Sequence, residues 1–214
     1  VFELVDGNWI ETGTLTSGLT FFRGLLGSSV AIRGDRALVG APGTSSSASS
    51  LADASAFIFE FNGSTWNQTV RLQPSTEDDK DLFGAQVDLI DDRAAVSAPE
   101  DDEVATSAGA VYLFDLIGSG WQETFKLLAD DGLAEDYFGQ SISLNDNGIL
   151  LGAPRSSTET GVAYLFEPDG RVGLLDFGCV KRFDEFWIAN YARVALAAMD
   201  GDRDAAIQAI RDLG

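Results

Sequence analysis

The side chains best suited to chemistry in this sequence are carboxylates, which occur in short runs. The runs are Glu77-Asp78-Asp79-Lys80-Asp81, Asp91-Asp92, Glu100-Asp101-Asp102-Glu103, Glu135-Asp136 and Asn145-Asp146-Asn147-Gly148. Runs of this kind could supply the six to eight oxygens that Ca²⁺ requires. The chain has no histidine and one cysteine, Cys179. These counts exclude a histidine-based catalytic triad, an intrachain disulfide and a cysteine-based zinc site.

The acidic residues are unevenly distributed along the chain. Of the 214 residues, 34 are Asp or Glu and 14 are Lys or Arg, for a net charge of −20. Residues 1–170 hold 27 of the acids and 8 of the bases. Such a surface repels nucleic acid, because it has no basic stripe to replace phosphate counterions. No run approaches the roughly 20 apolar residues of a membrane span.

An internal repeat dominates residues 1–167. Tryptophans at 9, 66 and 121 are each followed 18 residues later by a glycine, at 27, 84 and 139. Another 15 residues on comes a proline, at 42, 99 and 154. Two spacings that hold in three copies indicate one structural unit, and we place the copies at about 5–61, 62–115 and 116–167.

Each copy has the pattern of short strands joined by tight turns. Alternating apolar residues follow the glycine, and a turn then comes at one fixed place: Gly34-Asp35, Asp91-Asp92 or Asp146-Asn147-Gly148. A second strand ends at the proline, which has no N–H to donate to a sheet. An aromatic strand and the segment after the next tryptophan complete four strands per repeat. Val1–Leu4 has the pattern of the end of a preceding copy.

The segments Leu82-Phe83-Gly84 … Ser97-Ala98-Pro99 and Tyr137-Phe138-Gly139 … Gly152-Ala153-Pro154 resemble FG-GAP repeats, the blades of the integrin α-subunit propeller. The first copy has Leu25-Leu26-Gly27 where Phe-Gly is expected. The resemblance implies a mainly β fold of three four-stranded antiparallel propeller blades, forming an open, partial propeller. It also implies ligand-binding loops, and the open blade edges would allow self-association.

Many FG-GAP blades carry an Asp-rich calcium loop between the glycine and the Gly-Ala-Pro. Only a short turn fills that interval here, so we interpret Asp91-Asp92 and Asn145–Gly148 as turn residues rather than metal ligands. The other acidic runs are expected to be solvated loops, with a weak calcium site as the alternative. Arg33-Gly34-Asp35 spells the tripeptide that integrins bind, but it falls at the same turn, and turn chemistry explains it.

From Arg171 the repeat pattern stops, after a junction at 168–170. The string Leu175-Asp176-Phe177-Gly178-Cys179-Val180-Lys181-Arg182-Phe183 resembles the Asp-Phe-Gly segment of UbiB/AarF-type atypical kinases. Apolar residues at three- and four-residue steps then predict a small helical appendage, and the whole tail spans 171–214. The resemblance implies that Asp176 would hold Mg²⁺ against ATP phosphates.

The rest of the kinase machinery is missing from the sequence. Residues 1–170 offer no nucleotide-binding lobe and no matching lysine, and Ala163 stands where the family has its metal-binding Asn. Tyr164–Gly170 fits both families, so a chimera joined at this stretch is one hypothesis.

The expected function is therefore a non-catalytic binding or scaffold module with no catalytic residue and no cofactor. It would be a fragment of a cell-surface or secreted FG-GAP propeller protein that contacts a protein or glycan through its blade loops. The alternatives are a UbiB-type kinase remnant, which would be cytoplasmic, and a chimeric product with no function of its own.

Overall fold

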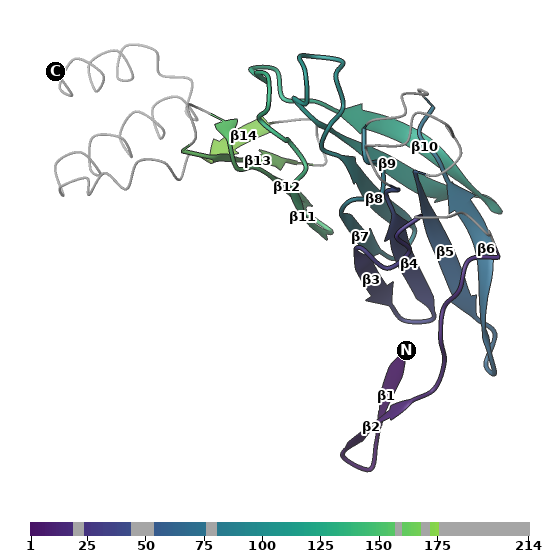
Figure 1. The fold of residues 1–214 in the computed structure, drawn as a ribbon. Helices are drawn as coiled ribbons and strands as arrows, with labels where there is room; N and C mark the ends of the chain where they lie inside the picture. The colour runs from purple at the N-terminus through teal and green to yellow at the C-terminus, as the bar shows by residue number, and fades with distance from the viewer. Residues whose placement is uncertain (19–23, 44–53, 76–80, 157–159, 168–171, 176–214) are drawn as a thin grey trace, which may run out of the picture. The chain divides into compact units, whose positions relative to one another are not determined.

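The computed structural model describes residues 1–18, 24–43, 54–75, 81–156, 160–167 and 172–175. These residues form a two-stranded hairpin followed by three four-stranded antiparallel sheets (Figure 1). The mainly β, partial-propeller architecture predicted from the repeat is thus confirmed. The predicted helical appendage, with Asp176 and Cys179, lies outside the described residues.

In each sheet the strands pair in chain order. The first sheet contains β3 (Val30–Arg33), β4 (Arg36–Ala41), β5 (Ser55–Phe61) and β6 (Trp66–Leu72). The second sheet contains β7 (Val87–Ile90), β8 (Arg93–Ala98), β9 (Ala110–Ile117) and β10 (Gly120–Leu127). The third sheet contains β11 (Ser141–Asn145), β12 (Gly148–Ala153), β13 (Val162–Phe166) and β14 (Val172–Leu175).

The sheets are offset from the sequence copies. The tryptophan strand, which opens a copy in the sequence, pairs with the aromatic strand before it, as β6 does with β5. The third sheet likewise extends past the boundary predicted at 167, because Val172–Leu175 pairs with β13. Four residues of the predicted tail are therefore the outer strand of the third sheet.

Two-residue turns join the first two strands of every sheet, as the sequence predicts. Arg33 pairs with Arg36 across Gly34-Asp35, and Ile90 pairs with Arg93 across Asp91-Asp92. Gly34 and Asp91 both have positive φ, at 57° and 32°, as hairpin turns of this length require. The Arg33-Gly34-Asp35 tripeptide is therefore a hairpin turn.

A backbone hydrogen bond ties the two halves of the repeat motif together. The glycine of each Phe-Gly position donates its N–H to the carbonyl two residues before the proline. These bonds are Gly27 to Gly40 at 2.9 Å, Gly84 to Ser97 at 2.8 Å, and Gly139 to Gly152 at 3.0 Å. All three glycines have φ between 88° and 97°, a region that L-residues rarely adopt.

The motif phenylalanine fills the core beside this bond. Phe83 is fully buried between the first and second sheets and meets Tyr112 edge to face at 5.4 Å. Phe138 does the same in the third sheet, meeting Tyr164 at 5.2 Å. Leu26 takes this position in the first sheet, where it packs against a smaller cluster.

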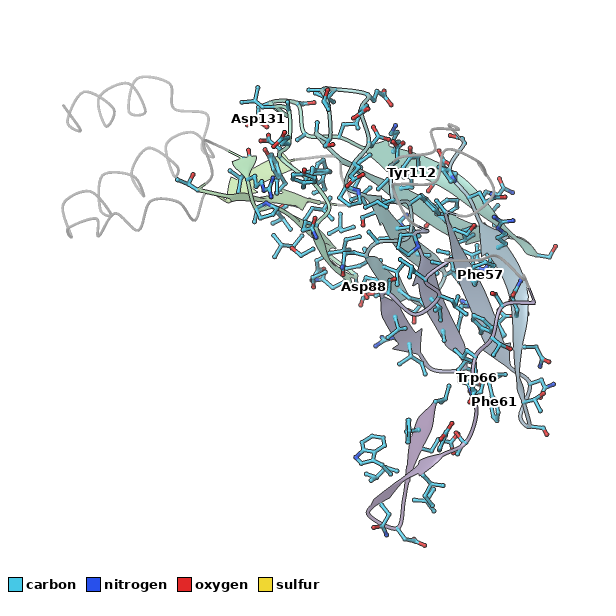
Figure 2. All side chains as sticks on the ribbon, viewed as in Figure 1. Phe57, Phe61, Trp66, Asp88, Tyr112 and Asp131 are labelled. Atoms are coloured by element: carbon cyan, nitrogen blue, oxygen red, sulfur yellow. The ribbon has the colours of Figure 1, made fainter. Side chains whose placement is uncertain are left out.

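Side chains also link the first strands of neighbouring sheets, β3, β7 and β11, which we call the inner strands. The Ser29 hydroxyl accepts a hydrogen bond from the Val87 amide at 3.0 Å, which links the first sheet's inner edge to β7. Asp88 accepts one from the Leu144 amide at 2.6 Å, which links β7 to β11 (Figure 2). Each bond satisfies a backbone donor of an inner strand that its own sheet leaves unpaired.

The N-terminal hairpin repeats the outer half of a sheet. β1 (Phe2–Val5) pairs with β2 (Asn8–Glu11), which carries Trp9 as β6 carries Trp66. In the first sheet Trp66 packs against Phe61, with ring centroids 5.5 Å apart (Figure 2). Trp9, in contrast, is 69% exposed.

The Gly84 position gives a direct test of why the motif uses glycine. A Cβ at Gly84 would overlap the Ser55 carbonyl oxygen, whereas at Gly27 no described atom lies within 4 Å. We expect Gly84→Ala to lower the free energy of unfolding by about 3 kcal/mol, because it adds backbone overlap to the positive φ. Gly27→Ala should cost about 1 kcal/mol from φ alone. Urea denaturation of both variants measures the difference, and equal losses would contradict the steric explanation.

Candidate functional site

Two loops leave the second sheet at the end opposite its short turns. Residues 99–109 join β8 to β9, and residues 128–140 join β10 to β11. Ala98 pairs with Ala110, and Leu127 pairs with Val111. Both loops therefore begin at the same end of the strands. We call these two loops the loop face.

Backbone hydrogen bonds join the two loops into one surface. Glu135, Tyr137 and Phe138 donate their amides to the carbonyls of Thr106, Ser107 and Ala108, at 2.8, 3.1 and 2.8 Å. The loop face is therefore held by main-chain contacts like those of a sheet. Its side chains project from a fixed backbone, which favours recognition without an ordering cost.

A buried carboxylate anchors the first loop. Asp101 is 2% exposed and accepts hydrogen bonds from the Tyr112 hydroxyl at 3.1 Å and the Glu103 amide at 3.0 Å. The Lys126 ammonium lies 2.7 Å from the same carboxylate and 2.6 Å from Glu103. A buried charge is stable only when paired and hydrogen-bonded, and Lys126 provides that pairing.

The surroundings of Lys126 raise its pKa. Burial alone lowers the pKa of Lys126, but its hydrogen bonds to Asp101, Glu103 and Tyr112 outweigh burial and raise the pKa. Its ammonium also lies 5.1 Å from the centre of the Tyr112 ring, within cation–π range. Lys126 is thus a fixed cation and unsuited to act as a general base at neutral pH.

The third sheet carries a related but looser arrangement. The Tyr164 hydroxyl donates to Asp131 at 2.8 Å (Figure 2), and burial together with this bond raises the pKa of Tyr164 to about 12. Arg155 lies over the Tyr137 ring at 4.9 Å and 3.6 Å from Glu135. These contacts tie the second loop to the segment after β12.

The exposed part of the loop face combines negative charge with apolar side chains. The two loops carry eight carboxylates, of which all but Asp101 and Asp136 are at least partly exposed, and no basic residue. Val104 and Leu133 are 41% and 61% exposed among them. Glu100 has a raised pKa, from partial burial and from the charge of Asp102. The surface therefore offers anionic and apolar contacts together.

The expectation that the acidic runs are simply solvated is wrong for three residues. Asp81, Asp101 and Asp136 are 6%, 2% and 3% exposed. Asp136 accepts the Leu133 amide at 2.8 Å and so closes a turn of the second loop. One signal was present in the sequence: Asp81 and Asp136 both stand three residues before the motif glycine, a position that repeats.

The residues with metal-binding side chains form no cluster in the described part of the chain. In the ranges given above, no three His, Cys, Asp or Glu side chains are grouped so as to hold a metal ion. The turns at Asp91-Asp92 and Asp146-Asn147 lie at the opposite end of the sheets from the loop face. Asp176, the magnesium ligand implied by the kinase resemblance, is outside the described residues.

Over the same described ranges, no helix has the length and apolar character to cross a membrane.

The buried ion pair can be tested by removing its cation. Lys126→Met should lower the free energy of unfolding by about 2 kcal/mol at pH 7, because Asp101 stays buried without its counterion. Arg155→Met is the matched control, and we expect a loss within about 0.5 kcal/mol, since its partner is exposed. Urea denaturation measures both variants.

The pH dependence follows from the raised pKa of Lys126. The stabilisation is fully present below the unfolded lysine pKa of about 10.4 and is lost as pH rises through the higher folded pKa. The difference between Lys126→Met and wild type should therefore be constant from pH 6 to 9 and shrink only above about pH 10.4. A difference that vanishes near neutral pH would contradict the assignment.

Comparison with known families agrees with this geometry. Residues 66–114 and 121–166 match the model of the FG-GAP repeat. Each matched segment begins at a tryptophan and ends in an aromatic strand, β9 or β13. Comparison with curated proteins gives no match. Both phenylalanine–glycine positions, at 83–84 and 138–139, lie within these two segments, and the chain carries FG-GAP repeats over residues 66–114 and 121–166.

Proposed function

We propose that this chain is a non-catalytic binding module that contacts a protein partner through the loop face. The observation that supports it is the loop face itself. Its two loops are held by backbone hydrogen bonds and carry six carboxylates that are not buried, beside exposed Val104 and Leu133. FG-GAP repeats are typical of β-propeller binding modules, which agrees with this use of the loops.

The charge of the loop face selects the partner class. Carboxylates attract lysine and arginine, and the exposed apolar side chains add desolvated contacts that a purely ionic surface lacks. A sulfated or sialylated glycan would be repelled. We therefore favour a protein partner with a basic and apolar surface over the glycan alternative.

A binding role also agrees with the chemistry of the described residues. The groups best placed to react, Asp101, Tyr112 and Lys126, bond to one another and are largely buried. FG-GAP repeat domains are generally non-enzymatic. FG-GAP repeats are also typical of extracellular and cell-surface proteins, and we propose that location for this module.

The kinase-remnant hypothesis rests on the tail 171–214, and the chimera hypothesis on its junction with the repeats at 164–170. Most of these residues lie outside the described part of the chain, so both hypotheses stay predictions. No observation in the three sheets favours phosphate or nucleotide binding over the protein-binding role.

Matched charge variants test the loop face. The triple variant Glu100→Gln, Asp130→Asn, Glu135→Gln removes three carboxylates from the face and leaves the partners of Lys126 in place. The control Glu3→Gln, Asp6→Asn, Asp35→Asn removes three exposed carboxylates elsewhere. The probe is a ten-residue peptide of alternating lysine and leucine, titrated by calorimetry in 50 mM salt. We expect the loop-face variant to bind roughly tenfold more weakly and the control to stay within about twofold of wild type.

The two variants have the same net charge, so they separate a site from a general charge effect. Equal weakening in both would mean that the peptide responds only to the overall charge of −20, and the proposal would fail. The apolar part of the face can be tested with Leu133→Ser, which should weaken peptide binding without changing the salt dependence of the Kd. The loop-face charge variant should instead reduce that salt dependence.

A further inference from the structure

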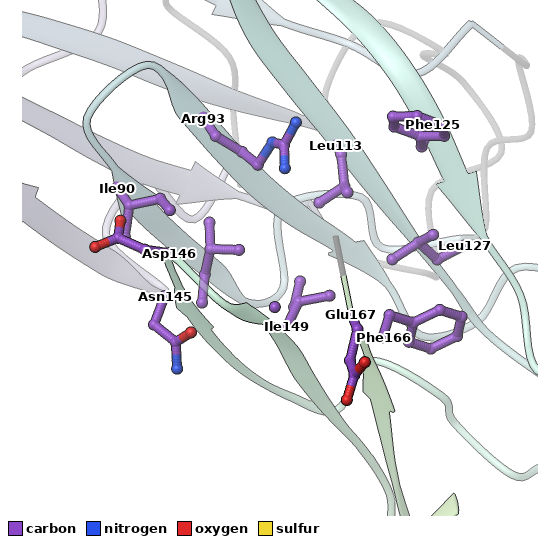
Figure 3. A pocket seen from close by; sticks show the side chains of 12 residues that line it. Ile90, Arg93, Leu113, Phe125, Leu127, Asn145, Asp146, Ile149, Phe166 and Glu167 are labelled. Carbon is purple, nitrogen blue, oxygen red and sulfur yellow. The ribbon is translucent and has the colours of Figure 1, made fainter. Parts of the chain in front are cut away.

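An apolar cavity of about 180 Å³ lies between the second and third sheets, near their short turns (Figure 3). Its walls include Leu113, Phe125 and Leu127 from the second sheet and Ile149 and Phe166 from the third. Arg93 lines one side, held by Asp115 at 2.6 and 3.0 Å. The cavity is separate from the loop face, which lies at the other end of the strands.

The corresponding place between the first and second sheets is filled by a tryptophan. Strand register equates Arg93 with Arg36, Asp115 with Glu60, and Phe125 with Val70. Trp121, on the outer strand of the second sheet, packs against the same core cluster as Val70. The Arg36 guanidinium lies over its ring at 5.2 Å while also pairing with Glu60 at 3.2 Å.

The third sheet has no tryptophan to fill its own interface. Its outer strand is β14, Val172–Leu175, and the sequence from 167 to 175 contains no tryptophan, whereas the outer strands β6 and β10 contain Trp66 and Trp121. The consequence is visible on the facing sheet. Phe125 is 57% exposed, whereas its counterpart Val70 packs against the core. The cavity therefore corresponds to the space that an indole ring occupies one interface earlier.

We propose that this cavity binds a tryptophan side chain presented by another polypeptide. A cavity of about 150 Å³ is known to accept benzene, so about 180 Å³ suits an aromatic ring. Arg93 lies where Arg36 covers Trp121 and would cover the incoming ring by the same cation–π contact. Asp146 and Glu167 at the edge disfavour an anionic ring or a neighbouring carboxylate on the partner.

N-Acetyltryptophanamide is the probe, titrated into the full ¹⁵N-labelled chain and followed by amide chemical shifts. We expect one site with a Kd on the order of 1 mM and shifts at Phe125, Leu127 and Ile149. N-Acetylleucinamide should bind at least about fivefold more weakly, since it lacks the ring. Phe125→Ala should weaken tryptophanamide binding roughly three- to tenfold by removing one aromatic wall.

Trp121→Ala provides a positive test of the equivalence. Removing that ring should open a second cavity under Arg36, so this variant should bind two equivalents and show new shifts at Val70. If Trp121→Ala fails to fold, the titrations of wild type and Phe125→Ala still test the proposal. No saturable shifts at the cavity, or equal binding of the leucine and tryptophan amides, would overturn it. Free indole that binds more than about tenfold more tightly than N-acetyltryptophanamide would overturn a polypeptide as the source of the ring, because the flanking amides would then hinder entry.

Discussion

The hydrogen bond between the Phe-Gly glycine and the carbonyl two residues before the proline organises each sheet and its neighbour. In three copies it has nearly the same length, and each time the glycine adopts a φ near 90°. Beside this turn, Phe83 and Phe138 enter the core between sheets in the second and third copies, and Leu26 takes the position in the first. At Gly84 the same turn brings the loop against the backbone at the end of the first sheet, too close for a side chain. One backbone geometry therefore sets strand pairing, core filling and the approach of successive sheets.

The loop face depends on this arrangement. Since the Phe-Gly loop of the third sheet is fixed against the end of the second, its backbone can bond to the loop between β8 and β9. The buried Asp101–Lys126 pair then stabilises that loop from below. Carboxylates on the outer surface remain exposed to a partner, whereas Asp101 and Asp136 beneath it are buried and structural. The same residue type thus serves two purposes, which burial separates.

Departures from the repeat are as informative as the repeat itself. Arg36 and Arg93 occupy equivalent positions and each pairs with an acid on the third strand of its sheet. Among the described residues, a tryptophan ring lies beneath Arg36 and none lies beneath Arg93. Within the described part of the chain, the missing ring leaves apolar surface such as Phe125 exposed between the second and third sheets. This is a cost that a bound aromatic group would offset.

The sequence by itself determined the fold class, the number of sheets, the hairpin turns and the positions of the motif residues. It could do so because glycine, proline and tryptophan spacings report local backbone requirements that recur in every copy. Only the tertiary structure decided which carboxylates are buried, because the partners of Asp101 come from two different strands, at Tyr112 and Lys126. It also decided that Val172–Leu175 completes the third sheet and that a cavity replaces a tryptophan there. Those outcomes depend on contacts between segments far apart in the chain, which a linear pattern of residue types does not record.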